Sequence, residues 1–257
     1  MLSLKSKSTP TSLKIGRHSF LKLELVPEEY GNLVQGLIDL LPDHYVDPAS
    51  IVSTLERLGK PAAAEKLRQK IPEAKRTRSG DIGEALATDY IEEETEYSVP
   101  IKKLRWRDVR DMPMRGDDII GVLVSPRNET LKFLKAEAKG NQRLSREVLN
   151  TARKELDTNG GKPTPHALAF VAERLREMGS IDLSDRIEKA QLVTGIAEGQ
   201  VQHLLFTVSE TYPSKLQEEA LGNYTGPIHQ QSIGFRVSGH QNLISSVYEG
   251  ILDGLND

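Results

Sequence analysis

A continuous apolar run at residues 119–124, Ile-Ile-Gly-Val-Leu-Val, constrains the fold of this chain more than any other segment. Such a run without polar interruption is typical of a strand that is buried inside a sheet. A turn at Ser125–Asn128 and a second strand over Thr130–Ala138 follow it, so the sequence predicts an antiparallel hairpin. The helices predicted around this short sheet indicate an α/β or α+β fold.

Helical and extended patterns continue along the rest of the chain. Alternating or short apolar runs predict further strands at residues 19–26, 97–104, 203–209 and 232–237. Apolar spacing, capping residues and prolines predict helices that end at Pro42, Gly59 and Pro72, and near residues 91, 156, 178, 192 and 252. The residues before 9 are predicted to be a frayed polar tail.

A basic connector at Glu73–Arg78 divides these elements into two predicted units. Residues 1–75 are predicted to form a small mixed module, and residues 76–257 the principal domain. The small module either docks a partner protein or packs on the principal domain as an extension that only stabilises it. The principal domain is expected to begin with a helix capped by Ser79 or Asp81.

Composition excludes several classes of protein. The chain has 257 residues and no cysteine, which excludes disulfides, thiolate nucleophiles and cysteine-ligated zinc. No segment has the roughly 20 apolar residues of a membrane span, and the start lacks a signal-peptide core, so a cytoplasmic location is expected. The net charge of −3 means that any contact with nucleic acid must come from a local patch. Between Lys102 and Arg115, six basic residues stand against two acidic ones.

Three acidic residues and one lysine carry the predicted chemistry. Glu84 lies on the helix after the connector, and Asp118 directly precedes the buried strand. Glu137 and Lys139 lie two residues apart on the next strand and share one face of it. We expect the three carboxylates to converge on one Mg²⁺ or Mn²⁺ ion, because hard oxygen ligands suit these cations. The alternative is a structural ion pair on a solvated strand face.

Three segments carry a resemblance to a known family: Arg78–Glu84 (RSGDIGE), Met114–Asp118 (MRGDD) and Leu134–Gly140 (LKAEAKG). They resemble the PD-(D/E)XK nuclease superfamily, which has an α-β-β-β-α-β core, and within it the nuclease subunits of Hachiman anti-phage defence systems. The proline of that motif is absent, and Gly116 stands in the segment that replaces it. The resemblance covers about residues 75 to 250.

This resemblance implies a Mg²⁺-dependent deoxyribonuclease that hydrolyses phosphodiester bonds and acts with a superfamily 2 helicase subunit. It implies that Asp118 and Glu137 are metal carboxylates, that Lys139 is the catalytic lysine, and that Glu84 completes the ligand set. Asp117 stays open, because neighbouring side chains in a strand point to opposite faces. The alternative function is a nuclease-like interaction module that docks on and regulates a helicase with little cleavage of its own.

A basic run with one aromatic residue precedes the Asp118 strand. In the first interpretation it contacts the DNA backbone, and the aromatic ring stacks on a base or ribose. In the second it is an edge strand whose aromatic ring packs in the core. The residues of this predicted DNA-binding run are Lys102, Lys103, Arg105, Trp106 and Arg107.

Overall fold

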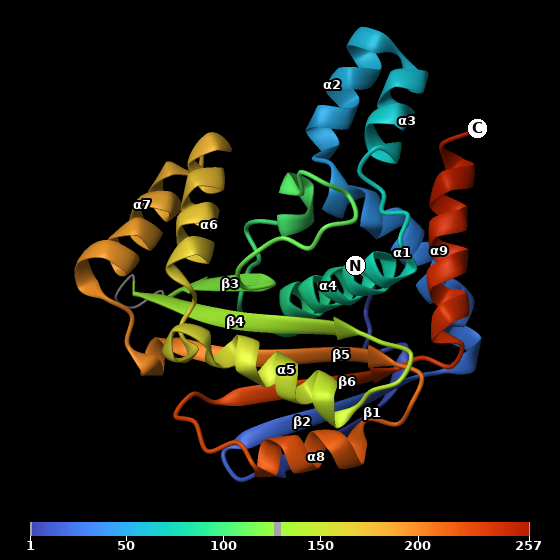
Figure 1. The fold of residues 1–257 in the computed structure, drawn as a ribbon. Coiled ribbons are helices and arrows are strands. Elements are labelled where there is room, and N and C mark those ends of the chain that lie inside the picture. Colours follow the sequence, from blue (N-terminus) through green and yellow to red (C-terminus); the bar gives the residue numbers. More distant parts are fainter. Residues whose placement is uncertain (1, 126–129, 257) are drawn as a thin grey trace.

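The computed structural model describes residues 2–125 and 130–256, which form one six-stranded mixed sheet with helices around it (Figure 1). The strand order is β1-β2-β6-β5-β4-β3. The pairs β1–β2 and β3–β4 are antiparallel, and the pairs between β2, β6, β5 and β4 are parallel. The strands are β1 (Ser8–Ile15), β2 (His18–Leu25), β3 (Ile119–Val124), β4 (Leu131–Gly140), β5 (Val201–Ser209) and β6 (Gln230–Arg236).

Helices cover the sheet on both faces, and the apolar clusters show which helix covers which strand. One face of β4, β5 and β6 packs against α1, α4 and α9, whereas α5 and α8 pack on the other face. Helix α6, with α7 against it, covers β3 and the start of β4. The helices are α1 (Tyr30–Tyr45), α2 (Pro48–Leu58), α3 (Lys60–Arg68), α4 (Lys75–Glu94), α5 (Arg146–Asp157), α6 (Pro165–Glu177), α7 (Ile181–Lys189), α8 (Ser214–Gly222) and α9 (His240–Gly254).

The hairpin at the centre of the sequence prediction is confirmed. β3 pairs antiparallel with β4, with Ile119 opposite Ala136. Local signals also placed several helix starts correctly: the Asp47 side chain accepts a hydrogen bond from the Ser50 N–H at 3.2 Å, and the Ser145 hydroxyl accepts one from the Val148 N–H at 3.3 Å. The turn predicted at residues 125–128 lies, beyond its first residue, outside the described residues.

The start of the chain is not a frayed tail. Leu2 and Leu4 are 3% and 1% exposed, and the Leu2 N–H donates to the Asp89 carboxylate at 3.1 Å. β1 then pairs along its whole length with β2. The prediction was wrong because Leu2 and Leu4 stand isolated among polar residues in the sequence, and Asp89, which holds the Leu2 N–H, lies 87 residues further along the chain.

The predicted boundary near residue 75 does not separate two sheets. β2 pairs parallel with β6, so that Phe20 lies opposite Ser232 near the middle of one continuous sheet. Helix α1 packs against α9 at the other end of the chain. Residues 1–75 therefore contribute strands and core to the same body. Within them, α2 and α3 form a helical hairpin that stands away from the sheet, although Leu67 of α3 still joins the core (Figure 1).

Other differences follow from tertiary packing. α1 continues through Pro42 to Tyr45, and α4 begins at Lys75, so the basic connector is the first turn of that helix. The strand predicted at 97–104 is an irregular segment with one bridge, Ser98 to Val122, followed by a 3₁₀ helix. α8 lay outside the predicted elements. No helix in the described part of the chain is long and apolar enough to cross a membrane.

Candidate active site

An ion pair on β4 forms the centre of the candidate site. The Lys139 ammonium contacts the Glu137 carboxylate, and the two residues share a face of the strand as the alternation of side chains predicts. Glu137 is 5% exposed, whereas the Lys139 side chain is 24% exposed. The carboxylate is therefore buried, and the ammonium reaches from it toward solvent.

Asp118, one residue before β3, joins this pair. One of its carboxylate oxygens accepts a hydrogen bond from the Ala138 N–H at 3.2 Å, which fixes Asp118 beside β4. Because Ile119 pairs with Ala136 across the two strands, Asp118 lies next to Glu137. Burial raises the pKa of Glu137 to about 8, and the negative charge of Asp118 adds to this effect.

The charge of Lys139 is stabilised by these two acids. Burial acts to lower the pKa of Lys139, but the carboxylates of Glu137 and Asp118 outweigh it and raise the pKa above its ordinary value. Lys139 is therefore a positively charged group that two carboxylates hold at the end of β4. A buried and a half-buried carboxyl group with only one lysine beside them have too little positive charge nearby, and a bound divalent cation would supply it.

Glu84 reaches the site because α4 approaches β4 very closely. A Cβ on Gly83 would lie 3.2 Å from the backbone nitrogen of Gly140, and a Cβ on Gly140 would collide with the carbonyl oxygen of Ser79. The Ser79 hydroxyl also donates to the Gly140 carbonyl at 2.8 Å. The glycines and the serine of the two sequence motifs thus permit the close packing that brings Glu84 to the end of β4.

Glu84 and Asp118 line one cavity of about 480 Å³, together with Lys139 and Lys103. Burial raises the pKa of Glu84 to about 8, and Asp118 is the next largest cause. Glu137 is not among the residues that line this cavity. Within residues 2–125 and 130–256, no three His, Asp or Glu side chains form a group that could hold one metal ion.

The structure thus brings Asp118 together with Glu137 and Lys139, and separately with Glu84. The described side chains do not show the predicted convergence of all three acids. Their donor chemistry still fits a Mg²⁺ ion, because this ion is often held by one or two carboxylates, with waters and substrate phosphate completing its coordination. Asp118 and Glu137 are the residues that would hold it.

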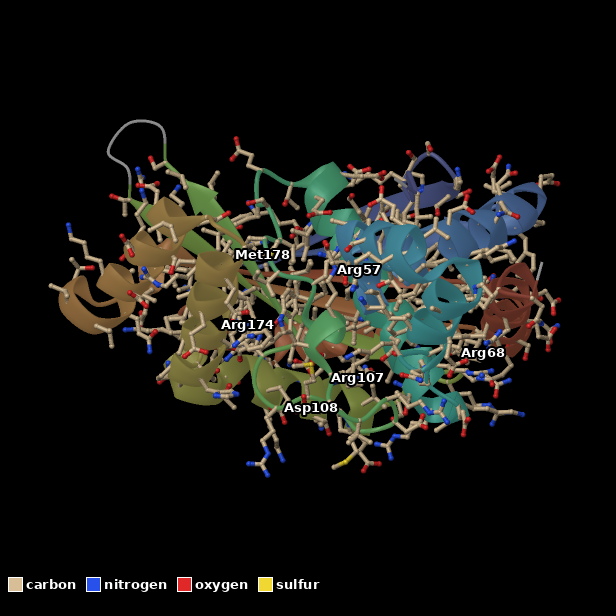
Figure 2. The ribbon with its side chains drawn as sticks, turned by 90° about the horizontal axis from the view of Figure 1, so that it is seen from above. Arg57, Arg68, Arg107, Asp108, Arg174 and Met178 are labelled. Atoms are coloured by element: carbon tan, nitrogen blue, oxygen red, sulfur yellow. The ribbon has the colours of Figure 1, made fainter. Side chains whose placement is uncertain are left out.

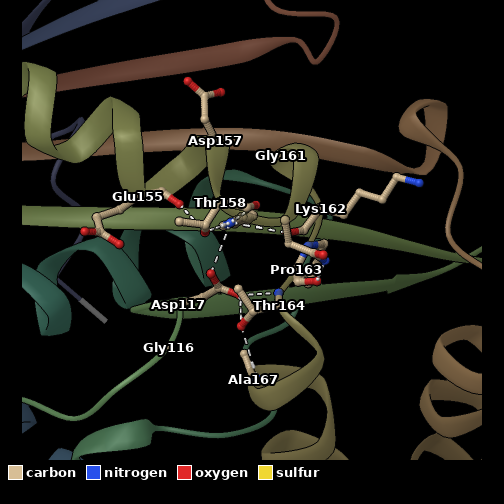
Figure 3. A network of polar contacts seen from close by, with 12 residues as sticks. Gly116, Asp117, Glu155, Asp157, Thr158, Gly161, Lys162, Pro163, Thr164 and Ala167 are labelled. Carbon is tan, nitrogen blue, oxygen red and sulfur yellow. Dashed lines mark hydrogen bonds and ion pairs between the residues drawn. The ribbon is translucent and has the colours of Figure 1, made fainter.

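Asp117 has a different role from Asp118. Its carboxylate forms an ion pair with the Lys135 ammonium at 3.2 Å, and it accepts hydrogen bonds from the Thr164 N–H at 2.7 Å and hydroxyl at 3.1 Å (Figure 3). The Lys135 ammonium also donates to the Thr158 carbonyl at 3.0 Å and the Lys162 carbonyl at 3.2 Å. Asp117 therefore ties the start of β3 to the loop before α6, and its carboxylate is occupied by these contacts within the protein.

The predicted DNA-binding run is held largely by the protein itself. The Lys103 ammonium donates to the Asp117 carbonyl at 2.9 Å. Arg105 donates to the Asp43 carbonyl at 2.7 Å and lies 3.3 Å from the Asp47 carboxylate. Lys102 is half-buried, with no contact that bears on DNA binding.

Arg107 contradicts the prediction of a phosphate contact. It is 5% exposed, and its guanidinium donates to the Asp81 carboxylate at 2.8 Å. The Tyr45 hydroxyl donates to the same carboxylate at 2.7 Å. Asp81 is thus a buried partner rather than a helix cap. Sequence reasoning missed this pair because its members lie on separate elements, and the one available signal was an acid inside the apolar face of α4.

The comparison with known families bears on the chain as a whole. The HamA family model matches residues 3–251. The chain belongs to the HamA family. The match begins before β1, so the strands of the first 75 residues are part of the HamA unit rather than an appended module.

One HamA relative can be compared directly. The Hachiman protein HamA of Bacillus cereus is 25% identical over 152 residues, which are 59% of this chain and 53% of the relative. The aligned part thus spans about half the length of that protein. All four predicted site residues, Glu84, Asp118, Glu137 and Lys139, lie within the stretch that the HamA family model matches.

Proposed function

We propose that this HamA-family chain is a Mg²⁺-dependent deoxyribonuclease with a PD-(D/E)XK-type site, and that it serves a Hachiman anti-phage defence system. The observation that carries the proposal is the position of Asp118 beside the Glu137–Lys139 ion pair, where β3 pairs with β4. An acid beside one strand and an acid and a lysine on the next is the arrangement that the superfamily motif predicts. The name of the Bacillus cereus relative supports the link to Hachiman defence.

Each side chain has a defined part in this proposal. Asp118 and Glu137 bind the cation, which polarises the scissile phosphate and makes an attacking water more acidic. Lys139 orients that water and offsets the negative charge that develops on the phosphate in the transition state. A lysine suits this position, since its compact charge is fixed by the carboxylate beside it. Glu84, in the middle of α4, lines a cavity with Asp118 and Lys139 and supplies a further acid there.

We also propose a helicase partner of the HamB type. The sequence has no G-x-x-x-x-G-K-[ST] phosphate loop, so ATP-driven movement along DNA requires another protein. The second candidate function, a module that docks on and regulates this helicase with little cleavage, is favoured by the α2–α3 hairpin. Three apolar side chains spaced along α2 are largely exposed there: Val52 (51%), Leu55 (45%) and Leu58 (64%).

Cleavage by the purified chain alone distinguishes the two functions. Supercoiled and linear DNA are incubated with the protein in Mg²⁺, in Mn²⁺ and in a chelator, with Lys139→Met as the matched inactive variant. The nuclease proposal expects cleavage that needs the cation and is lost in the variant. Absence of cleavage under every cation condition, combined with tight binding to the helicase, assigns the chain to the second function.

A further inference from the structure

A second cavity of about 520 Å³ opens beside Asp118, on the side away from α4. Its volume lies within the range of about 300–1,000 Å³ that is usual for small-molecule sites. Apolar side chains from three parts of the chain form its walls, among them Ile120 of β3, Val171 of α6 and Met112 of the segment before β3. The cavity therefore offers an apolar space for a flat, weakly polar group.

Two aromatic rings line this space. Trp106 and Phe170 meet edge to face, with ring centroids 6.0 Å apart, and neither is fully buried. The Arg174 guanidinium lies 5.7 Å from the centre of the Phe170 ring. Exposed His166 and Arg115 add polar groups to the lining. Aromatic faces with a few polar groups are what proteins use to hold an unstacked nucleobase.

The second cavity adjoins the cavity of the candidate active site. Asp118, Lys103 and Met114 line both cavities. Figure 2 shows the segment that carries Arg107 and Asp108 between α6, marked by Arg174, and α2, marked by Arg57. This segment forms the wall that the two cavities share, and Asp118 lines the same cavity as Trp106 and Phe170.

We propose that this cavity binds the base of an unpaired nucleotide next to the scissile phosphate, which makes the protein selective for single-stranded or locally unpaired DNA. The inference rests on the proposed nuclease function. A base in an intact duplex is stacked and paired, so it reaches the cavity only after unpairing, whereas an unpaired base enters without that cost. The specificity is for strand state rather than sequence, because every base has a face that stacks on an aromatic ring.

The test combines a change in the protein with a change in the DNA. Fluorescence anisotropy measures binding of a single-stranded oligonucleotide and of its duplex form in a chelator, and cleavage is measured separately in Mg²⁺. Trp106→Ala removes one aromatic wall, and a single abasic site moved along the strand removes the base. Trp106→Phe retains a ring, and Tyr212→Ala removes an aromatic side chain that is 60% exposed at a distant surface.

The proposal expects Trp106→Ala to weaken single-strand binding by about 5- to 150-fold, the range for one stacked base, with a smaller effect on duplex. An abasic site at one position of the strand should weaken binding to the wild type by a similar factor. The same abasic site should not weaken binding to Trp106→Ala any further, because each change removes the same contact. Trp106→Phe should lose less affinity than Trp106→Ala because it retains a ring, and Tyr212→Ala should stay within about twofold of wild type.

Two results overturn the inference. One is equal single-strand affinity of wild type and Trp106→Ala, and the other is an abasic loss that adds in full to the loss from the variant. The abasic arm uses wild-type protein, so it decides the question even if Trp106→Ala fails to fold. Failure of the nuclease proposal is visible separately, as an absence of Mg²⁺-dependent cleavage, while the binding arm in chelator still reports on the cavity.

Discussion

The Asp117 carboxylate and the Lys135 ammonium form a buried ion pair at 3.2 Å, one residue away from the candidate metal ligand Asp118. The two side chains are 3% and 2% exposed. The lysine lies in the middle of β4, and the aspartate holds the Thr164 N–H at the start of α6. This pair therefore sets the position of β3, β4 and α6 relative to one another around the site.

Lys135→Met should destabilise the protein by about 3–5 kcal/mol, because it leaves the Asp117 carboxylate buried without its cation. Urea unfolding measures the change. The double variant Lys135→Met, Asp117→Leu should lose less stability than the single variant, since it also removes the carboxylate that would otherwise be buried without a partner. Lys132→Met on the same strand is the control, because Lys132 is exposed. A single-variant loss as small as that of the control contradicts the structural role.

Glu137→Gln and Lys139→Met should each lower Mg²⁺-dependent DNA cleavage by about 10²- to 10³-fold with the fold intact. The first removes a carboxylate that faces Asp118, and the second removes the charge that offsets the transition state. Circular dichroism checks folding, and plasmid cleavage checks activity. Lys132→Met should cleave at the wild-type rate, and wild-type cleavage by both site variants contradicts the assignment.

Substitutions of Asp118 and of Glu84 should differ in their effect on metal affinity. Asp118 lies next to Glu137 across the paired strands, whereas Glu84 lines the neighbouring cavity together with Asp118. We therefore expect Asp118→Asn to weaken Mn²⁺ binding by at least about tenfold, which is the loss usual when a residue that supports a metal ligand is replaced. Glu84→Gln should weaken Mn²⁺ binding less. Isothermal titration calorimetry with Mn²⁺ measures both. An equal loss from the two variants indicates that Glu84 moves in to join the other acids when the ion binds.

The sequence predicts the central hairpin and the Asp118–Glu137–Lys139 contact because both depend on local rules. Side chains two residues apart share a strand face, and a short turn pairs adjacent strands in an antiparallel hairpin. These rules place Lys139 beside Glu137 before any fold is known. The structure adds Gly83 and Gly140, whose missing side chains allow α4 to approach β4.

The features that the sequence does not reveal depend on partners far along the chain. Leu2 is buried because its N–H finds Asp89, and Arg107 is buried because it meets Asp81. Lys135 has no local signal other than its place within an apolar strand. In each case a polar residue reads as surface until its partner is seen, since burial of a polar or charged group is tolerated only with that partner.

Deletion of residues 1–72 should abolish folding rather than release a free nuclease domain. The deletion removes β2, which pairs with β6, and with it the buried side chains Phe20 and Leu23. Loss of core strands costs far more than the usual net stability of a domain. Circular dichroism and thermal unfolding test this expectation, and a cooperative transition in the truncated protein contradicts it.

Helicase docking is tested with a substitution that leaves the fold intact rather than with that deletion. Leu55→Glu with Leu58→Glu alters only exposed side chains of α2, so the variant should fold and cleave DNA like the wild type. If the α2–α3 hairpin docks the helicase, the variant should lose most of that binding in a pull-down with the purified partner. Undiminished binding places the docking surface elsewhere.

His44 should make the stability of the protein depend on pH. It is 1% exposed in α1, and burial, with smaller contributions from Lys102 and Arg105, lowers its pKa to about 3. An unfolded histidine binds a proton below a pH of about 6.5, whereas His44 in the folded chain does not until the pH is far lower. The unfolded state thus gains protons first, and the free energy of unfolding should fall as the pH drops from 7 toward 3.

At pH 5 this contribution should reach about 2 kcal/mol relative to pH 7. Urea unfolding at the two pH values measures it as the difference between wild type and variant, which cancels the titration of other groups. His44→Leu and His44→Asn differ in how they pack, but neither can bind a proton, so both should lower the pH dependence by the same amount. A wild-type pH dependence in both variants would show that His44 is not the group that titrates, and would assign the acid sensitivity to the remaining buried histidines and carboxylates.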